Sequence, residues 1–245
     1  MINDTLIEIL KEFHAQRMKF IKNAPNPNDR EKYAEYIAGC FMPCAQKILA
    51  GFFEVKCMSD GDKTIRRIYP TAIELYYHEE GTGRFKDPIM YHTNDRKIRD
   101  HENYFKERGI TGLPYFPIGS LNPHTSGLDI TFENPKEQYR ASFLIREYIV
   151  EYNPENKMPV KNSTDIYDDM LLNGIPLEQA DWIEWHDGEK LKENAIIRKW
   201  RRNVPDYKQI SDTPYRWDKN TEGEPSFTAT SGRYKKCPFN WQFAK

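Results

Sequence analysis

Two strand-like runs that each contain a charged residue constrain the fold of this chain more than any other feature. They read IYPTAIELYY and ASFLIREYIV, and they contain Glu74 and Arg146. Their β-branched and aromatic residues predict β-strands, in which successive side chains point to opposite faces of a sheet. If Ile73 and Leu75 face the core, Glu74 and Tyr76 lie together on the opposite face.

Glu74 and Arg146 each have two interpretations. A buried arginine requires a carboxylate or an anionic ligand, so the first interpretation pairs Arg146 with Glu74. Glu74 would then line a cleft as a partly buried carboxylate that can transfer a proton. The second interpretation places Glu74 on a solvated edge strand and leaves Arg146 pointing to solvent.

The surrounding pattern predicts helices before these strands and an aromatic tail after them. Apolar residues recur at helical spacing in two segments, with a break expected near Pro43 and an end at Gly51. The helices are predicted at 3–23 and 30–51, the strands at 52–58, 64–79, 127–134 and 139–153, and a short helix with a Ser or Thr cap at 163–174. Residues 93–112 are polar and predict a surface excursion. We expect the aromatic tail to pack on the body of the protein.

The composition is that of a globular protein. The chain has 245 residues, of which 30% are charged and 13% aromatic, and this length can bury a substantial core. It contains no apolar run of membrane-spanning length, and its amino terminus lacks the apolar core of a signal peptide. These features predict a soluble, cytoplasmic protein that does not bind membranes.

A basic segment near the tail is the candidate contact with nucleic acid. The formal net charge is −1, so any such contact requires a local patch rather than a general basic excess. Arg198, Lys199, Arg201 and Arg202 surround Trp200, a combination that suits a phosphate backbone and a stacked base. The alternative is an ordinary solvated face.

The cysteines and histidines give no strong metal pattern. Cys40 and Cys44 lie four residues apart with no second pair downstream, which predicts reduced thiols in the core. His78 and His92, together with neighbouring glutamates, could hold a metal ion, but their spacing matches no established metal motif.

Five segments follow one another in an order that resembles a known family. They are CAQKILAGFFEV, IYPTAIELYY, DPIMYH, GSLNPHTSGLDITF and FLIREY, over about residues 40–150. The order is similar to that of the alkyladenine (3-methyladenine) DNA glycosylases. That family has a helix ending in an LL-G step, an ETEAY strand, a D-x-x-x-H turn, a G-x-L-Y-V-Y hairpin, a YGM turn and an LLR strand. The closing NWQFAK is faintly similar to its last strand.

The resemblance implies roles for five residues. Glu74 corresponds to the glutamate that activates water, and Arg146 to the arginine that helps to hold this water. Tyr76 corresponds to an aromatic residue that stacks on the extruded base. His92 corresponds to a histidine of the pocket wall, although DPIMYH is one residue longer than the family's turn. His124 corresponds to the aromatic wall of the hairpin.

The chain departs from the family in the parts that engage duplex DNA. Ser126 precedes Gly127, where the family has a tyrosine that fills the gap left by the extruded base. LNPH stands in place of LYVY, and residues 93–112 have no counterpart. Because extrusion of a base costs a few kcal/mol, weak activity on duplex DNA is expected.

The resemblance therefore implies an α/β protein of the α+β type, with a curved, mainly antiparallel sheet surrounded by helices. It would form one domain over residues 1–245, helical over 1–50, with a sheet core over 51–150 and a helical and irregular part over 151–245. The implied activity is that of a DNA glycosylase of base excision repair, which hydrolyses the N-glycosidic bond of a damaged or modified purine without a cofactor. The alternatives are a non-enzymatic module that binds a nucleobase, a nucleotide, a single strand or a protein, and a metal-dependent hydrolase.

Overall fold

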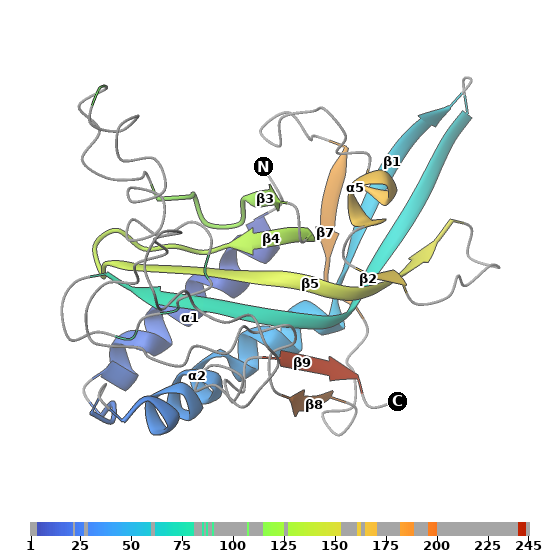
Figure 1. Ribbon diagram of the computed structural model, residues 1–245. Coiled ribbons are helices and arrows are strands. Elements are labelled where there is room, and N and C mark those ends of the chain that lie inside the picture. Colours follow the sequence, from blue (N-terminus) through green and yellow to red (C-terminus); the bar gives the residue numbers. More distant parts are fainter. Residues whose placement is uncertain are drawn as a thin grey trace, which may run out of the picture.

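The computed structural model shows an α+β protein in which two long helices accompany a curled, antiparallel half-barrel sheet (Figure 1). It describes residues 4–21, 23–26, 29–59, 62–80, 85, 87, 90, 107, 115–124, 127–152, 161–162, 165–170, 182–188, 196–199 and 240–243. The helices are α1 (Asp4–Ile21), α2 (Arg30–Ala50) and α5 (Ile166–Asp169), and the strands are β1 (Phe52–Ser59), β2 (Asp62–Glu79), β3 (Leu121–His124), β4 (Gly127–Thr131), β5 (Tyr139–Glu151), β6 (Lys161–Asn162), β7 (Ile183–His186), β8 (Ile196–Lys199) and β9 (Asn240–Phe243). The expected α+β class with a curved antiparallel sheet is confirmed. Over these described residues, no helix has both the length and the apolar character needed to cross a membrane.

Helix α2 is continuous, so the break expected near Pro43 is wrong. The helix runs on to Ala50 because its buried side chains, Phe41 among them, hold it in place despite the missing N–H donor. Cys40 and Cys44 lie on this buried face as free thiols, as predicted. Burial raises the pKa of the Cys40 thiol to about 12, which leaves it unreactive at neutral pH.

Strand β2 is the centre of the sheet. One of its edges pairs with β5 from Arg67 to Glu79. The other edge pairs first with β1, up to Ile68, and then with β9 over Ala72–Glu74. The sheet order is β3-β4-β5-β2-β1-β7, and β9 and β8 extend it beside β2. Glu74 therefore has backbone neighbours on both sides and does not lie at a sheet edge.

The carboxy-terminal part adds strands to this sheet, where the sequence predicted helical and irregular structure. β7 pairs with β1, β9 with β2, and β8 with β9. Trp241 of β9 is fully buried, with its ring centroid 6.0 Å from that of Phe143. The expected packing of the tail on the body is thus confirmed for these strands. The predicted helix at 163–174 is shorter, since α5 has Asp165 as its N-cap residue and ends at Asp169.

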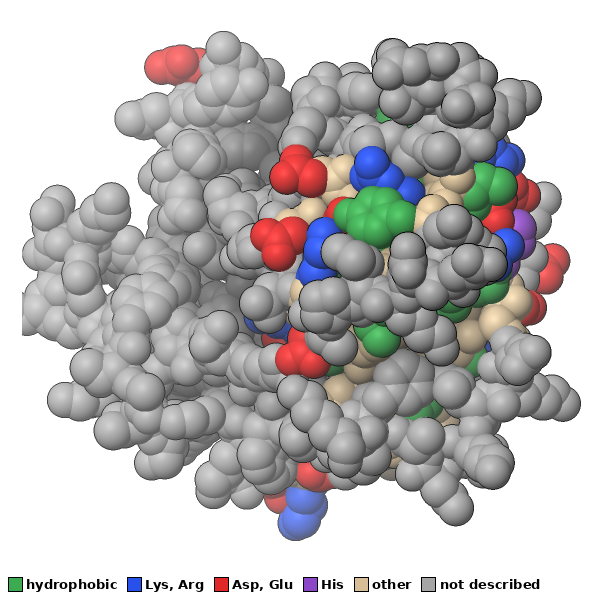
Figure 2. Space-filling model, turned by 90° about the vertical axis from the view of Figure 1, so that its right-hand side faces the viewer, with side chains coloured by type: hydrophobic (Ala, Val, Ile, Leu, Met, Phe, Trp, Pro, Cys, Tyr) green, Lys and Arg blue, Asp and Glu red, His purple; other side chains and the backbone are tan. Residues whose placement is uncertain are grey.

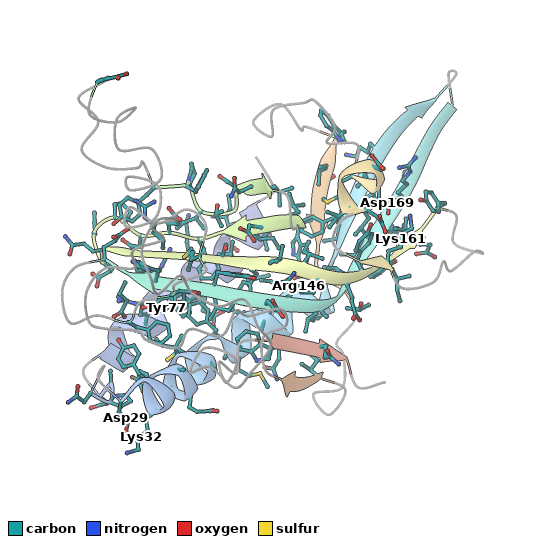
Figure 3. All side chains as sticks on the ribbon, viewed as in Figure 1. Asp29, Lys32, Tyr77, Arg146, Lys161 and Asp169 are labelled. Carbon is teal, nitrogen blue, oxygen red and sulfur yellow. The ribbon has the colours of Figure 1, made fainter. Side chains whose placement is uncertain are left out.

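Asp169 anchors the short helix α5 to the sheet. Its carboxylate accepts hydrogen bonds from the hydroxyls of Tyr148 and Tyr152, both at 2.7 Å, and pairs with Lys161 Nζ at 2.8 Å. Figure 3 shows Lys161 and Asp169 close together at this end of the sheet. Figure 2 looks onto the molecule from this side, where the described hydrophobic, basic and acidic side chains lie next to one another. A helix of four residues depends on such contacts because it cannot be stable alone.

A β-bulge interrupts the ladder between β2 and β5. Three Cα pairs around it define the shift in register: Pro70↔Tyr148, Ala72↔Glu147 and Ile73↔Ile145. Thr71 on β2 and Arg146 on β5 are the extra residues. A bulge bends its strand and changes the direction of the side chains that follow. Ile68 and Ile73 therefore both belong to the core, although an odd spacing would put them on opposite faces of a regular strand.

A polar network lies inside the interface between the helices and the sheet. Arg17 of α1 donates from Nε to Tyr77 Oη at 2.9 Å and pairs through Nη2 with Glu79 at 3.3 Å. Glu79 also accepts hydrogen bonds from Tyr33 of α2 at 2.8 Å and from Tyr77 at 2.7 Å. The network joins both helices to β2, and the sequence analysis did not anticipate it.

His14 of α1 extends this network towards β5. Its Nδ1 is hydrogen-bonded to the hydroxyl of Tyr139, and the Arg17 guanidinium lies 4.3 Å from the Tyr139 ring. Burial and the positive charge of Arg17 lower the pKa of His14 from 6.5 to about 4. The imidazole is therefore neutral in the folded protein at pH values where it is protonated in the unfolded chain.

The free energy of unfolding should consequently fall as the pH is lowered from 6.5 towards 4. The contribution of a neutral His14 is fully present above the unfolded pKa and is lost as protons bind the unfolded chain. We expect a loss of about 1 kcal/mol between pH 7 and pH 5, less than the full pKa difference gives, because His14 is only partly buried. Urea denaturation at pH 7 and pH 5 measures this change in the free energy of unfolding. His14→Gln should reduce this difference; a variant with the same pH dependence as the wild-type protein would contradict the prediction.

Thr71→Val tests the bulge. The Thr71 hydroxyl oxygen is buried and has no hydrogen-bond partner within the described parts of the chain. Valine keeps the shape and removes this polar atom, so the free energy of unfolding should rise by about 1 kcal/mol in urea denaturation. Thr131→Val is the matched control, because the Thr131 hydroxyl has backbone carbonyl partners at 3.0 and 3.1 Å and its removal should destabilise the protein. Destabilisation by both variants would argue against this bulge geometry.

Candidate functional site

Glu74 and Arg146 form a buried ion pair across β2 and β5. Arg146 Nε donates to Glu74 Oε2 at 2.7 Å, with 0% of the Glu74 side chain and 13% of the Arg146 side chain exposed. The pairing predicted from the sequence is confirmed, and the alternative of a solvated edge-strand glutamate is wrong. The pair lies on the face of the sheet opposite Ile73 and Leu75, which belong to the core. Figure 3 shows Arg146 in the part of β5 beside β2 and near β9.

Tyr76 holds the same guanidinium from a second direction. Arg146 Nη2 donates to Tyr76 Oη at 2.8 Å, and the Tyr76 side chain is partly exposed. Arg146 is thus fixed by a carboxylate and a phenol that lie two residues apart on β2. The sequence analysis placed Tyr76 on the correct face but did not anticipate this contact.

Arg17 and Arg140 each pair with acidic residues of more than one segment, and the Glu74–Arg146 pair joins the neighbouring strands β2 and β5. Arg17 joins helix α1 to β2 through Glu79. Arg140 pairs with Glu80 at 2.7 Å and with Glu133 at 3.1 Å, and its guanidinium lies 4.1 Å from the Tyr115 ring. Arg140 thus joins β5 to the residue that follows β2 and to a residue just after β4.

Glu74 and Arg146, by contrast, stand on strands that backbone hydrogen bonds already hold together. A buried pair brings little net stability, because desolvation of the two charges offsets their attraction. A role in holding the fold together therefore explains Arg17, which joins a helix to the sheet, better than it explains the pair at the bulge. The buried carboxylate that Arg146 contacts, together with Tyr76, is therefore the candidate functional site.

Glu74 belongs to a row of residues that crosses the sheet at right angles to the strands. Consecutive Cα partners in this row, from β3 to β8, are Asn122, Asp129, Leu144, Glu74, Asn240 and Lys199. Residues directly opposite one another in neighbouring strands share a face of the sheet. Asp129 and Glu74 therefore lie on the same face on either side of Leu144, and Asp129 is 4% exposed.

The sequence analysis missed Asp129, although the signal was present. GLDITF contains one charged residue within an apolar strand, as IYPTAIELYY does, and the same argument about the cost of a buried charge applies to both. Its position across the sheet from Glu74 could not be read from the sequence, because it depends on the register of β4 with β5.

The remaining predicted site residues are only partly described. His124 ends β3 opposite Gly127, and Arg198 and Lys199 lie on β8 with Cα partners on β9. The structure describes only the backbone of these three residues. His92, Arg201 and Arg202 lie outside the described residues.

His78, one of the candidate metal ligands, lies in a buried position on β2. Its Nδ1 accepts a hydrogen bond from the Asp87 backbone N–H at 3.2 Å, and its Nε2 lies 3.9 Å from Glu80 Oε2. Among the residues that the structure describes, no group of three or more His, Cys, Asp and Glu side chains is arranged to hold a metal ion. His92, the other candidate ligand, lies outside this part.

Comparisons with protein-family models, with curated proteins and with solved structures find no match to this chain.

Proposed function

We propose that the protein hydrolyses the N-glycosidic bond of a damaged or modified purine in nucleic acid, with Glu74 as the general base. The observation that carries the proposal is the buried Glu74–Arg146 pair, in which Arg146 also contacts Tyr76. The pair lies on two strands that backbone hydrogen bonds already join. The curled antiparallel sheet with two amino-terminal helices is compatible with a fold of the alkyladenine glycosylase type. The last strand, β9, lies directly beside Glu74, which agrees with the similarity of NWQFAK to that family's closing strand.

The proposed reaction requires one carboxylate and one water molecule. The water attacks C1′ of the sugar while Glu74 accepts one of its protons. The C1′–N bond breaks, its electron pair leaves with the base, and a hydroxyl group remains on C1′. The proton passes to the departing base or to solvent. Arg146 and the rigid pairing of β2 on both edges fix the direction of the carboxylate, which is the contribution that orientation makes to such a reaction.

The basic segment supports a nucleic-acid substrate. The row across the sheet places the backbone of Lys199 two strands from Glu74, or about 10 Å at the usual spacing of strands. A phosphate bound at this segment would thus lie within reach of a nucleotide whose sugar is at Glu74. Weak duplex binding remains the expectation, because Ser126 occupies the position of the family's tyrosine.

A second candidate is a module of similar fold that binds a base, a nucleotide or a single strand without turnover. The complete burial of Glu74 and its contact with Arg146 favour this alternative, since they occupy the carboxylate. The two candidates differ in one measurable property, the release of a free base.

Glu74→Gln should abolish the release of free alkylated or deaminated purines from single- and double-stranded oligonucleotides. Glutamine has the same shape but cannot accept the proton of water, so the rate should fall at least about 10²-fold, while binding and fold are retained. Glu54→Gln is the matched control: Glu54 is an ion-paired glutamate on β1, 3.7 Å from Arg67, and its variant should keep full activity. Unchanged release by Glu74→Gln would exclude Glu74 as the base. Binding without any release, from pH 5 to neutral, would establish the binding module instead.

Tyr76→Ala should act mainly on substrate capture. The proposed stacking of the tyrosine on the base is worth about 1–3 kcal/mol, so the apparent affinity for a modified strand should fall by roughly tenfold or more. Tyr76→Phe separates the two contacts of this residue, since it keeps the ring and removes the hydrogen bond from Arg146. Equal losses of affinity in both variants would show that the hydroxyl, and not stacking, is what matters.

Arg198→Gln combined with Lys199→Gln should weaken the salt dependence of single-strand binding. Each phosphate contact contributes about 0.7 to the slope of log K against log salt concentration, so losing two contacts should reduce the slope by about 1.4. The double substitution Lys32→Gln and Lys56→Gln is the control, because it removes two exposed lysines elsewhere on the protein. Undamaged duplex should bind weakly at physiological salt. A slope that does not change would place the phosphate contacts outside this segment.

A further inference from the structure

The three side chains of the candidate site differ in their contact with solvent. Glu74 is completely buried, whereas 13% of the Arg146 side chain is exposed and Tyr76 is partly exposed. The guanidinium donates from Nε to Glu74 and from Nη2 to Tyr76, so it links the buried carboxylate to the partly exposed phenol. Arg17 and Arg140, at 2% and 0% exposed, offer no comparable access. A ligand that approaches from solvent meets Arg146 and Tyr76 before Glu74.

The two accessible groups suit an oxyanion. A guanidinium has five N–H donors in a rigid plane and no acceptor, and this geometry matches the oxygens of a phosphate. Tyr76 Oη accepts a hydrogen bond from Arg146 at 2.8 Å, so its own O–H points away from the guanidinium, towards an acceptor on another side. Phosphate oxygens accept hydrogen bonds from both kinds of donor. A cationic ligand, by contrast, would be repelled by Arg146.

We infer that Arg146 binds a phosphate of the nucleotide whose base is removed, and that it remains paired with Glu74 while it does so. The inference rests on the proposed function for the position of the sugar. The phosphates of a nucleotide are attached to the same sugar whose C1′ carries the base, so a sugar at Glu74 brings a phosphate close to the neighbouring cation. The inference adds a requirement for the substrate that does not depend on the base: the smallest ligand that uses the whole site is a nucleotide and not a nucleoside.

The change of charge during the reaction favours this arrangement. When Glu74 accepts a proton from water it becomes neutral, and it no longer balances the charge of Arg146. Removal of one charge from a buried ion pair is strongly destabilising. A phosphate bound at Arg146 keeps a negative charge beside the guanidinium during this step, and so it makes the transfer of the proton to Glu74 less costly.

The test compares the binding of 2′-deoxyinosine with that of its 5′-monophosphate and its 3′-monophosphate to the full-length protein. At least one monophosphate should bind about tenfold more tightly than the nucleoside, or better, as expected for hydrogen bonds between charged groups. Equal affinities for all three ligands would overturn the inference, and this measurement requires no variant.

Glu74→Gln gives a second measurement at the same site. It should bind that monophosphate at least about threefold more tightly than the wild-type protein does, because the glutamine no longer repels the phosphate. Its affinity for the nucleoside should stay the same. An unchanged affinity for the monophosphate would overturn the inference, because the phosphate would then lie too far from the pair to interact with Glu74.

Glu74→Gln combined with Arg146→Gln replaces the pair by two neutral side chains and leaves no buried charge alone. This variant should lose the preference for the monophosphate, and a preference that survives overturns the inference. The matched control is Glu54→Gln combined with Arg67→Gln, which neutralises another glutamate–arginine pair, 3.7 Å apart on β1 and β2, and should keep the preference. Urea denaturation shows whether each variant folds; if the first does not, the measurement on Glu74→Gln decides.

Release of the base from a single-stranded oligonucleotide is recorded in parallel, so that the two proposals fail separately. A preference for the monophosphate without any release would refute the glycosylase and leave Arg146 as the phosphate contact of a binding module. Release without a preference would refute the role of Arg146 and leave the glycosylase standing.

Discussion

The bulge between β2 and β5 is the constraint on which the arrangement of the candidate site depends. It inserts Thr71 into β2 and Arg146 into β5. Beyond this point, the residues of each strand that face the core are shifted by one position. Without the inserted residues, a strand that buries Ile68 would turn Ile73 away from the core and Glu74 towards it. The bulge therefore allows one long strand to contribute to the core on both sides of the bend and still present a carboxylate on the opposite face.

The distribution of buried charge follows from this geometry. The Arg17 network lies between the helices and the sheet and attaches three elements to one another. The Arg140 cluster and the Glu74–Arg146 pair lie on the other face, which is polar and yet largely buried. Because buried ion pairs contribute little net stability, their value lies in fixing geometry. Fixed geometry in the Arg17 network serves the fold, and at Glu74 it would serve the proposed reaction.

Local patterns in the sequence predicted both long helices, the central strands and the pairing of Arg146 with Glu74. These features depend on residue spacing and on the cost of a lone buried charge, and both can be read from short segments. The strands of the tail were missed, because β9 becomes a strand only by pairing with Ala72–Glu74, far away in the sequence. Pro43 was overrated as a helix breaker, since tertiary packing outweighs one lost hydrogen bond. Asp129 could be seen as a charge in a strand, but its relation to Glu74 required the register.

The candidate site is a product of sheet register more than of any single motif. Its row combines residues from positions 122, 129, 144, 74, 240 and 199, which come from six strands and from both halves of the chain. Glu74 has β5 on one side and β9 on the other, so its direction is determined by the middle and by the end of the chain together. A carboxylate that must be aimed at one atom benefits from such support on both edges.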